Sequence, residues 1–324
     1  MKKIIIAGAT GLVGSTICSI LEERNFPIAD IRFLASEKSA GKEITFRGKK
    51  HRIEVLDENA FDGFDIAFFA VSSDLSRRFV PIAANKGLRV IDNSSCFRMD
   101  KNVPLVVPEV NPQAITKDNY IIANPNCSTI QCMAPLFQIQ QHYGLKRIVY
   151  STYQSVSGSG MKGLRDLDEN IQEFYPYPIT KNIIPHIDSF LENGYTKEEI
   201  KMIMETKKIL HQDSLKITAT TVRVPIRFSH SVSVNVETTK DFDIAEVKSL
   251  MDNKLGMILV DNPMQNRYPV SSMAEGNDAI YVGRIRRDES LEFGLNLWTV
   301  ADNIRKGAAL NAVQIGEYLN KAGL

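Results

Sequence analysis

The first part of the chain alternates short apolar runs with segments of helical spacing. The runs that predict strands lie at 3–7, 31–35, 65–71, 88–92 and 120–123. Between them, apolar residues recur with a helical period and predict helices at about 12–24 and 75–86. This rhythm is typical of a parallel sheet with crossover helices. We therefore expect an α/β domain over residues 1–125.

The pattern changes after Pro125. A helix predicted at about 128–143 leads into long runs that alternate apolar and polar positions, at 146–156, 216–224 and 230–238. Such alternation predicts a mixed or antiparallel sheet with one covered face. Helical spacing returns at the end of the chain, from Asn303 onward. We therefore expect a second, α+β domain over 126–302, and a C-terminal helix over 303–324 that completes the first domain.

Composition narrows the class of protein without identifying it. The 324 residues are 44% hydrophobic and 24% charged, which is enough for two separate cores. The 39 basic and 38 acidic residues nearly balance, so the protein has no net electrostatic field that would favour binding to nucleic acid or to an anionic membrane. No apolar stretch approaches the roughly 18 residues of a membrane span, and the four cysteines do not form a disulfide framework. We expect a cytoplasmic protein.

A glycine loop directly follows the first predicted strand and opens the first helix. Gly8, Gly11 and Gly14 stand where a pyrophosphate would meet free backbone N–H groups and a helix N-terminus, as in a Rossmann-type domain. The spacing departs from G-x-G-x-x-G, so a strand-to-helix turn without a ligand is the alternative. The predicted cofactor contacts in this loop are Gly8, Thr10, Gly11, Leu12, Val13 and Gly14.

The residues after the second strand bear on the choice of cofactor. Glu37 could accept a hydrogen bond from the 2′-hydroxyl of NAD, whereas Lys38 and Ser39 could hold the 2′-phosphate of NADP. Solvation of all three is the alternative. We predict NADP, bound by Lys38 and Ser39.

Cys127 is the candidate nucleophile. It lies between a predicted strand and a predicted helix, and a helix N-terminus favours the thiolate. Cys18 and Cys132 fall on predicted helices and are expected to be buried. Cys96, in a polar loop, is a rival that lacks the strand-to-helix placement. The dispersed histidines and cysteines show no metal-ligand spacing, so we expect no metal.

Several motifs follow one another in a specific order. They lie at 8–14, 92–95, 97–99, 125–129, 154–160, 223–225, 276–278, 281–284 and 301–309. Together they resemble the aspartate-semialdehyde dehydrogenases over essentially the whole chain. One departure is Glu37-Lys38, where the family commonly has an arginine before the serine.

The resemblance implies an NADP-dependent oxidoreductase. Its reaction is the reversible reductive dephosphorylation of L-4-aspartyl phosphate to L-aspartate 4-semialdehyde and phosphate, through a thioester on Cys127. Such an enzyme serves lysine, threonine, methionine and diaminopimelate biosynthesis. The resemblance also implies a homodimer, built largely by the second, catalytic and dimerisation domain.

The resemblance assigns roles to three more residues of the second domain. His230 transfers protons, Gln154 orients the thioester or substrate, and Arg223 binds the substrate α-carboxylate. Histidine suits proton transfer at neutral pH, and the planar arginine fork can bind a carboxylate through two bonds. From the residues alone, a structural histidine, a loop hydrogen-bonding glutamine and a surface or bridging arginine are the alternatives.

Phosphate and ammonium groups need partners of opposite charge. By resemblance, Arg98 and Lys201 bind phosphate and Glu198 receives the ammonium, with Glu199 as a possible one-residue misalignment. An ordinary surface pair is the alternative for Glu198 and Lys201. The remaining predicted cofactor contacts are Ser157, Gly158 and Asn303. Asn303 has helix capping as its alternative role.

Two other functions remain open from the sequence. An N-acetyl-γ-glutamyl-phosphate reductase would use the same chemistry, but the context of Cys127 and the segment around Arg223 resemble the aspartate enzymes. A non-catalytic nucleotide-binding relative would not need Cys127, Gln154, Arg223 and His230 together.

Overall fold

The computed structural model describes residues 1–324, which divide into two compact units. The first unit comprises Met1–Pro125 and Ala308–Leu324, and the second comprises Asn126–Gly307. The chain therefore returns to the first unit after Gly307, later than the expected position before Asn303. The reason is that Asn303 hydrogen-bonds to Ser155 within the second unit. None of the helices combines the length and the apolar composition that a membrane span requires.

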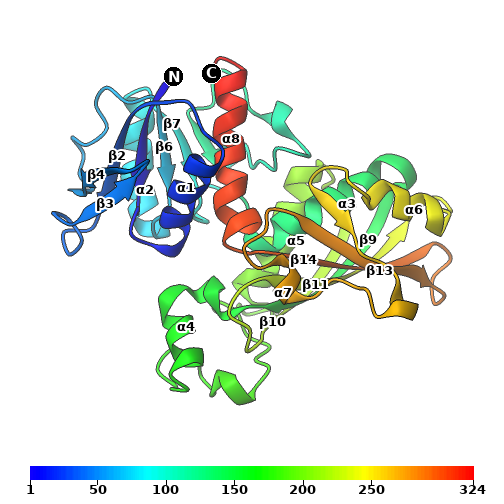
Figure 1. Ribbon diagram of the computed structural model, residues 1–324. Helices are drawn as coiled ribbons and strands as arrows, with labels where there is room; N and C mark the ends of the chain where they lie inside the picture. The colour runs from blue at the N-terminus through cyan, green and yellow to red at the C-terminus, as the bar shows by residue number, and fades with distance from the viewer. The chain divides into compact units, whose positions relative to one another are not determined.

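The first unit contains a six-stranded sheet in the order β5-β2-β1-β6-β7-β8, with every neighbouring pair parallel. Its strands are β1 (Lys2–Ala7), β2 (Ile28–Ala35), β5 (Glu54–Val55), β6 (Ile66–Phe69), β7 (Arg89–Asp92) and β8 (Ile121–Ala123). Its helices are α1 (Leu12–Glu23), α2 (Ser73–Asn85) and α8 (Leu310–Lys321). Figure 1 shows α8, in red, beside this sheet. The expected parallel α/β sheet is confirmed.

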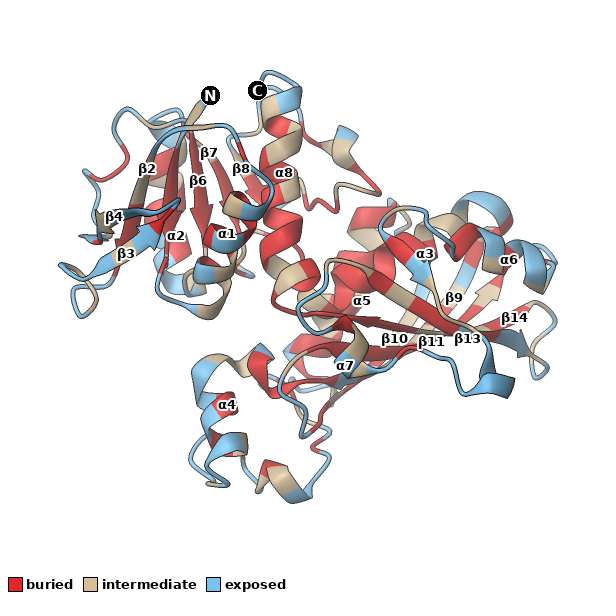
Figure 2. Ribbon diagram, in the orientation of Figure 1, coloured by how far each residue is buried: buried red, intermediate tan, exposed pale blue.

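Both faces of this sheet are buried. Successive side chains of a strand point to opposite faces, so Ile4 and Ile6 of β1 pack in the cluster that contains the apolar residues of α1 and α8. Ile5, between them, packs in the cluster that contains Phe79 and Val80 of α2. The central strands are accordingly buried along their length in Figure 2. Burial on two faces explains why the sequence shows unbroken apolar runs here.

The second unit contains a mixed sheet in the order β10-β9-β11-β14-β13-β12. Its strands are β9 (Leu145–Gln154), β10 (Lys216–Arg223), β11 (His230–Thr238), β12 (Met257–Leu259), β13 (Ile280–Asp288) and β14 (Gly294–Ala301). The β9–β10 and β12–β13 pairs are parallel and the other neighbours are antiparallel. The expected mixed sheet is confirmed.

The second unit contains five helices, and three of them pack on one face of its sheet. They are α3 (Cys127–Tyr143), α4 (Gly160–Asp168), α5 (Lys197–Leu210), α6 (Ile244–Met251) and α7 (Ser271–Ala274). Of these, α3, α5 and α6 pack on the sheet, as Figure 1 shows. The other face carries Tyr153 and Trp298, whose rings lie 5.4 Å apart.

Short elements connect the larger ones. The hairpin β3 (Glu43–Phe46) and β4 (Lys49–Arg52) belongs to the first unit. The 3₁₀ turns are Pro112–Ala114, Val156–Ser159, Ile179–Lys181 and Pro263–Gln265. A π-helical turn, Arg305–Ala309, precedes α8, so the last helix begins later than the sequence predicts. The carboxylate of Asp302 accepts the N–H groups of Ile304 and Arg305 at the start of that turn.

Candidate active site

Cys127 is the first residue of α3, as the sequence predicts. The preceding residue, Asn126, caps the helix, because its side-chain oxygen accepts the N–H groups of Ser128 and Thr129 at 2.9 and 3.3 Å. Cys127 therefore lies where the partial positive charge of the helix end favours a thiolate. Its Sγ lies 3.2 Å from Nε2 of His230.

His230 opens β11 and is fully buried. Burial lowers the pKa of its imidazole well below the usual value, and the positive charge of Arg223 lowers it further. The ring is therefore neutral at physiological pH. A neutral imidazole beside a nucleophilic sulfur is an arrangement suited to acyl transfer chemistry.

Arg223 ends β10, directly beside Gln154, the last residue of β9. Its Nη1 donates to the carbonyl of Ser155 at 2.6 Å, while its buried Nε has no hydrogen-bond partner. A Cβ atom at Gly158 would lie 2.8 Å from this Nη1 and 3.3 Å from Cε1 of His230. The missing side chain at Gly158 thus leaves room for both groups, and the unpartnered N–H can bind an anionic ligand.

Glu198 lies on the buried face of α5, with only 5% of its surface exposed. Its Oε1 accepts from Nδ2 of Asn126 at 2.9 Å and from Nε2 of Gln154 at 3.1 Å. Burial alone would raise its pKa, but the charge of Lys201, these two amides and Arg223 hold the pKa below its usual value. The site therefore contains a buried carboxylate ion.

The structure separates Glu198 from its neighbour Glu199. The carboxylate of Glu199 accepts the N–H groups of Thr196 and Thr221 at 2.7 and 3.0 Å, which completes a capping box at the start of α5. Its acceptors are thus engaged in helix and sheet structure. Glu198 is the residue of the two that contacts Gln154.

Lys201 follows Glu198 by one turn. Its Nζ donates to Asp188 at 2.7 Å and lies 3.3 Å from Oε2 of Glu198. The negative charge of Asp188 was not anticipated from the sequence. A phosphate that binds Lys201 would therefore approach an ammonium group that already contacts Asp188 and Glu198.

The sequence analysis also missed Glu205, which lies two helical turns after Glu198 on α5. Its Oε2 accepts the main-chain N–H of Asn126 at 2.6 Å, and only 1% of the residue is exposed. The spacing of seven residues places both carboxylates on one helix face. The sequence shows the two glutamates at this spacing but not their burial, so it offered only a weak signal for Glu205.

Asn303 joins the predicted residues Ser157 and Gly158 beside His230. Its Oδ1 accepts from the hydroxyls of Ser155 and Ser157 and from the N–H of Ser229, at 3.0, 3.2 and 2.9 Å. Asn303 does not cap the last helix, which begins several residues later. It instead connects three segments of the second unit.

The other cysteines are less suited to nucleophilic chemistry. Burial raises the pKa of Cys18 and of Cys132 to about 12. Burial also raises the pKa of Cys96, although that residue is only partly buried. Cys127 is therefore the thiol best placed for nucleophilic chemistry.

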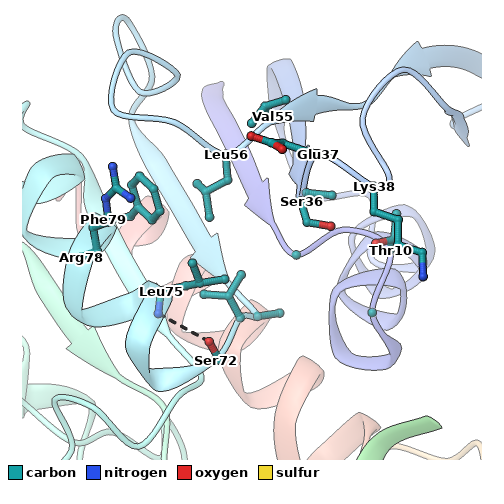
Figure 3. Close-up of a pocket in the computed structure, with 15 residues that line it drawn as sticks. Thr10, Ser36, Glu37, Lys38, Val55, Leu56, Ser72, Leu75, Arg78 and Phe79 are labelled. Atoms are coloured by element: carbon teal, nitrogen blue, oxygen red, sulfur yellow. Dashed lines mark hydrogen bonds between the residues drawn. The ribbon is translucent and has the colours of Figure 1, made fainter.

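A cavity of about 570 Å³ lies at the carboxyl ends of β1, β2 and β6 in the first unit. Figure 3 shows Ser36, Glu37 and Lys38, which follow β2, and Ser72, Leu75 and Arg78 from the start of α2. In a doubly wound sheet this edge is where nucleotides bind. The lining of small, apolar and charged groups fits the adenosine half of a dinucleotide.

The glycine loop closes one side of this cavity. A Cβ atom at Gly8 would lie 2.2 Å from the carbonyl oxygen of Ala70, and one at Gly14 would lie 2.1 Å from the carbonyl oxygen of Gly8. These two glycines allow the turn to form. At Gly11 the nearest atom would be 3.5 Å away, so its missing side chain leaves open the approach of a phosphate instead.

The predicted cofactor residues of the first unit divide into two groups. Those that line the cavity are Gly8, Thr10, Gly11 and Lys38. Those that are not among its lining residues are Leu12, Val13, Gly14 and Ser39. The N–H of Ser39 donates to Ser36 within a turn. Ser72 and Arg78 line the cavity without having been predicted.

Arg98, the predicted phosphate-binding arginine, belongs to the first unit. It is 8% exposed, and its Nη2 donates to the carbonyl of Asn93 at 2.9 Å. This contact orients the guanidinium within its polar loop.

Comparison with known proteins assigns both units to one kind of enzyme. Residues 3–118 match the family described as semialdehyde dehydrogenase, NAD binding domain. Residues 133–306 match the family described as semialdehyde dehydrogenase, dimerisation domain.

Individual relatives match over nearly the full chain. An aspartate-semialdehyde dehydrogenase of Aquifex aeolicus is 49% identical, with 99% of each chain covered. The crystal structure of aspartate semialdehyde dehydrogenase II from Vibrio cholerae superposes with a TM-score of 0.97 at 43% identity, and each chain is fully covered. A second structure of the Vibrio cholerae protein, described as complexed with ASA, matches with the same TM-score and identity, and 99% of that chain is covered.

Proposed function

Because the chain belongs to the aspartate-semialdehyde dehydrogenase family, we propose that it interconverts L-4-aspartyl phosphate and L-aspartate 4-semialdehyde with release or uptake of phosphate. The observation that carries the proposal is the contact between Sγ of Cys127 and Nε2 of His230, 3.2 Å apart at a helix N-terminus. This pair has the geometry that a thioester-forming enzyme needs.

The first chemical step is addition of sulfur to the aldehyde. The Cys127 thiolate attacks the carbonyl carbon, a C–S bond forms, and the carbonyl electron pair moves to oxygen. His230, beside Sγ, stabilises that oxygen through its Nε2. A bound nicotinamide supplies hydride transfer to or from the same carbon.

Three residues orient the amino-acid part of the substrate. The unpartnered Nε of Arg223 binds the α-carboxylate, and the Glu198 carboxylate receives the ammonium. Gln154 holds Glu198 through its amide and orients the thioester. A substrate that lacks either charge would leave a buried partner unsatisfied, which gives the site its selectivity.

Phosphate binding is assigned to Arg98 and Lys201. Both are cations with a polar contact that orients them, to Asn93 and to Asp188 respectively. Replacing Arg98 or Lys201 by alanine should raise the KM for phosphate more than the KM for the semialdehyde.

NADP is the proposed cofactor. A nicotinamide cofactor is consistent with the NAD-binding domain match, and Lys38 in the cavity lining supplies a cation for a 2′-phosphate. Ser39, Ser157, Gly158 and Asn303 complete the proposed contacts. Lys38→Ala should raise the KM for NADP and leave the KM for NAD nearly unchanged. Glu37→Ala is the matched control, because it removes the neighbouring side chain of opposite charge. Equal or higher efficiency with NAD in the unchanged protein would contradict the assignment.

A homodimer is the proposed assembly, formed through the open face of the second sheet. A cavity of about 410 Å³ on this face is lined by Tyr153, Tyr268, Val270 and Trp298 among others. Tyr268 and Val270 are 37% and 42% exposed, and exposed apolar residues that gather on one face mark interaction sites. Tyr268→Asp should reduce the light-scattering mass from two chains to one. A mass of one chain for the unchanged protein would contradict the dimer.

The deciding experiment is phosphate-dependent reduction of NADP with L-aspartate 4-semialdehyde. N-acetylglutamate semialdehyde and NAD are run in parallel, and Cys127→Ala is the inactive control. Turnover with the aspartate compound alone supports the proposal. Turnover with the N-acetylated compound would favour the related reductase, and no turnover with either would favour a non-catalytic role.

A further inference from the structure

The two ring nitrogens of His230 meet different partners. Nε2 lies 3.2 Å from Sγ of Cys127, and Nδ1 accepts the main-chain N–H of Ser155 at 3.0 Å. A backbone N–H can donate a hydrogen bond but cannot accept one. Nδ1 must therefore present its lone pair, and the proton of the neutral ring resides on Nε2.

The Ser155 amide is held rigidly in this direction. The carbonyl of Gln154, in the same peptide unit, accepts the N–H of Val224 at 2.9 Å. Carbonyl and N–H point in opposite directions across a trans peptide, so this bond aims the Ser155 N–H at the ring. The next N–H along the chain, that of Val156, donates to the carbonyl of Ile226 at 2.8 Å. Rotation of the peptide would break this ladder.

The Ser155 hydroxyl is held as well. It lies 3.0 Å from Nδ1 of His230 and 3.0 Å from Oδ1 of Asn303. The hydroxyl can rotate to donate to either group, whereas the main-chain N–H of Ser155 can only donate to Nδ1. Asn303 thereby fixes the segment that carries the Ser155 amide.

We propose that His230 acts as a neutral Nε2–H donor of fixed orientation, and that the Ser155 amide and Asn303 are the positioning groups that fix this tautomer. This assignment rests on the proposed function for its chemical meaning. In the step that forms the C–S bond, His230 then acts as a hydrogen-bond donor and not as the proton acceptor that the sequence led us to expect.

The tautomer changes where the protons go. The Cys127 thiol cannot pass its proton to Nε2, because that nitrogen already carries one, so the thiol proton is lost to solvent. The thiolate then supplies the electron pair of the new C–S bond, and the carbonyl pair becomes a lone pair on oxygen. The resulting negative oxygen accepts a hydrogen bond from Nε2–H without proton transfer. Charge and protons balance with the ring neutral throughout.

An imidazolium form is disfavoured by the surroundings. A proton on Nδ1 would point at the Ser155 N–H, which leaves only the Ser155 hydroxyl to accept it. The charged or titratable groups that face the ring are Cys127 on α3 and Arg223 on β10. The fixed positive charge of Arg223 adds to the effect of burial, and both lower the pKa of His230.

Nitrogen NMR of the protein with ¹⁵N-labelled histidine rings tests the assignment directly. His230 is fully buried, whereas the other histidines, His51, His142, His186 and His211, are exposed or partly exposed. We expect one ring with a protonated Nε2 and a bare Nδ1 that keeps these signals from about pH 8 to about pH 5. A protonated Nδ1, or an imidazolium at neutral pH, would overturn the proposal. The measurement needs no substrate, so it stands apart from a failure of the proposed activity.

Asn303→Ala tests the positioning role, with Ser157→Ala as the matched control. Ser157→Ala removes both hydrogen bonds between Ser157 and Asn303 and the contact of the Ser157 hydroxyl with that of Ser155, but it leaves the bond between Asn303 and Ser155. We expect mixed tautomers in Asn303→Ala alone. With the donor misplaced, alkylation of Cys127 at neutral pH should slow by about tenfold, which corresponds to a rise of one unit in the thiol pKa. Unchanged ring signals in Asn303→Ala, with only lower stability, would show that Asn303 has a structural role alone.

Discussion

Asn126 uses three hydrogen-bonding groups, one to cap α3 and two to connect the nucleophile segment to α5. Its side-chain oxygen caps α3, its side-chain amide donates to Glu198, and its main-chain N–H donates to Glu205. Replacing the side chain removes the first two bonds and leaves the third. Asn126→Ser is a matched variant, because serine retains the capping oxygen but cannot donate as the amide does.

The expected magnitude follows from these bonds. Loss of the helix cap costs about 1 kcal/mol. Loss of the donor to a buried carboxylate ion costs about 2 kcal/mol, since hydrogen bonds to charged groups are the stronger class. Asn126→Ala should therefore lower the free energy of unfolding of the second unit by about 3 kcal/mol, and Asn126→Ser by about 2 kcal/mol.

Trp298 makes the measurement specific. It is the single tryptophan of the chain and lies in β14, so its fluorescence during urea unfolding follows the second unit. The urea concentration at the midpoint of unfolding should be lowest for Asn126→Ala, higher for Asn126→Ser and highest for the unchanged protein. An alanine variant within about 0.5 kcal/mol of the unchanged protein, or equal effects of alanine and serine, would refute the reasoning.

Three further predictions use other parts of the structure. Gly14→Ala would place a Cβ atom 2.1 Å from a main-chain oxygen of the glycine loop, so binding of the reduced nicotinamide cofactor, measured by calorimetry, should be lost together with stability of the first unit. The stability contributed by the Glu198 carboxylate is complete above its ordinary pKa of 4.5 and is lost as the pH falls through its depressed folded-state pKa. The stability difference between the unchanged protein and Glu198→Gln, followed by Trp298 fluorescence, should thus shrink as the pH is lowered from about 6 to below about 4; a constant difference would argue against an ionised Glu198. Iodoacetamide at about pH 8 should alkylate Cys127 and spare Cys18 and Cys132, whose pKa of about 12 leaves roughly one thiolate in ten thousand. Peptide mass spectrometry measures the labelling, and equal labelling of all cysteines would contradict the burial argument.

The parallel sheet could be predicted because its strands are buried on both faces and leave unbroken apolar runs. The hairpin of β3 and β4 could not, since Lys49–Arg52 consists of three basic residues and a histidine, with no apolar alternation. The start of the last helix was also misplaced. Asn303 continues the helical spacing of the sequence, but its side chain is engaged with serines of the second unit and the helix begins after a π turn.

The site shows the same division between local and distant information. The position of Cys127 at a helix start could be predicted because such a start is encoded within a few residues. Glu205 was missed because its partner, the N–H of Asn126, is 79 residues away and belongs to the main chain. The role of the Ser155 amide is invisible for a similar reason, since every residue other than proline carries such a group.

The position of α8 in the first unit has a consequence for synthesis. Val313 and Ile315 of α8 belong to the same buried cluster as Ile4 and Ile6 of β1, near the opposite end of the chain. During translation, the N-terminal sheet therefore stays without α8 until residues 308–324 have left the ribosome, while Asn126–Gly307 is one continuous segment that can fold earlier. A product truncated before α8 would carry a complete second unit and a first unit whose buried cluster lacks the apolar residues of α8.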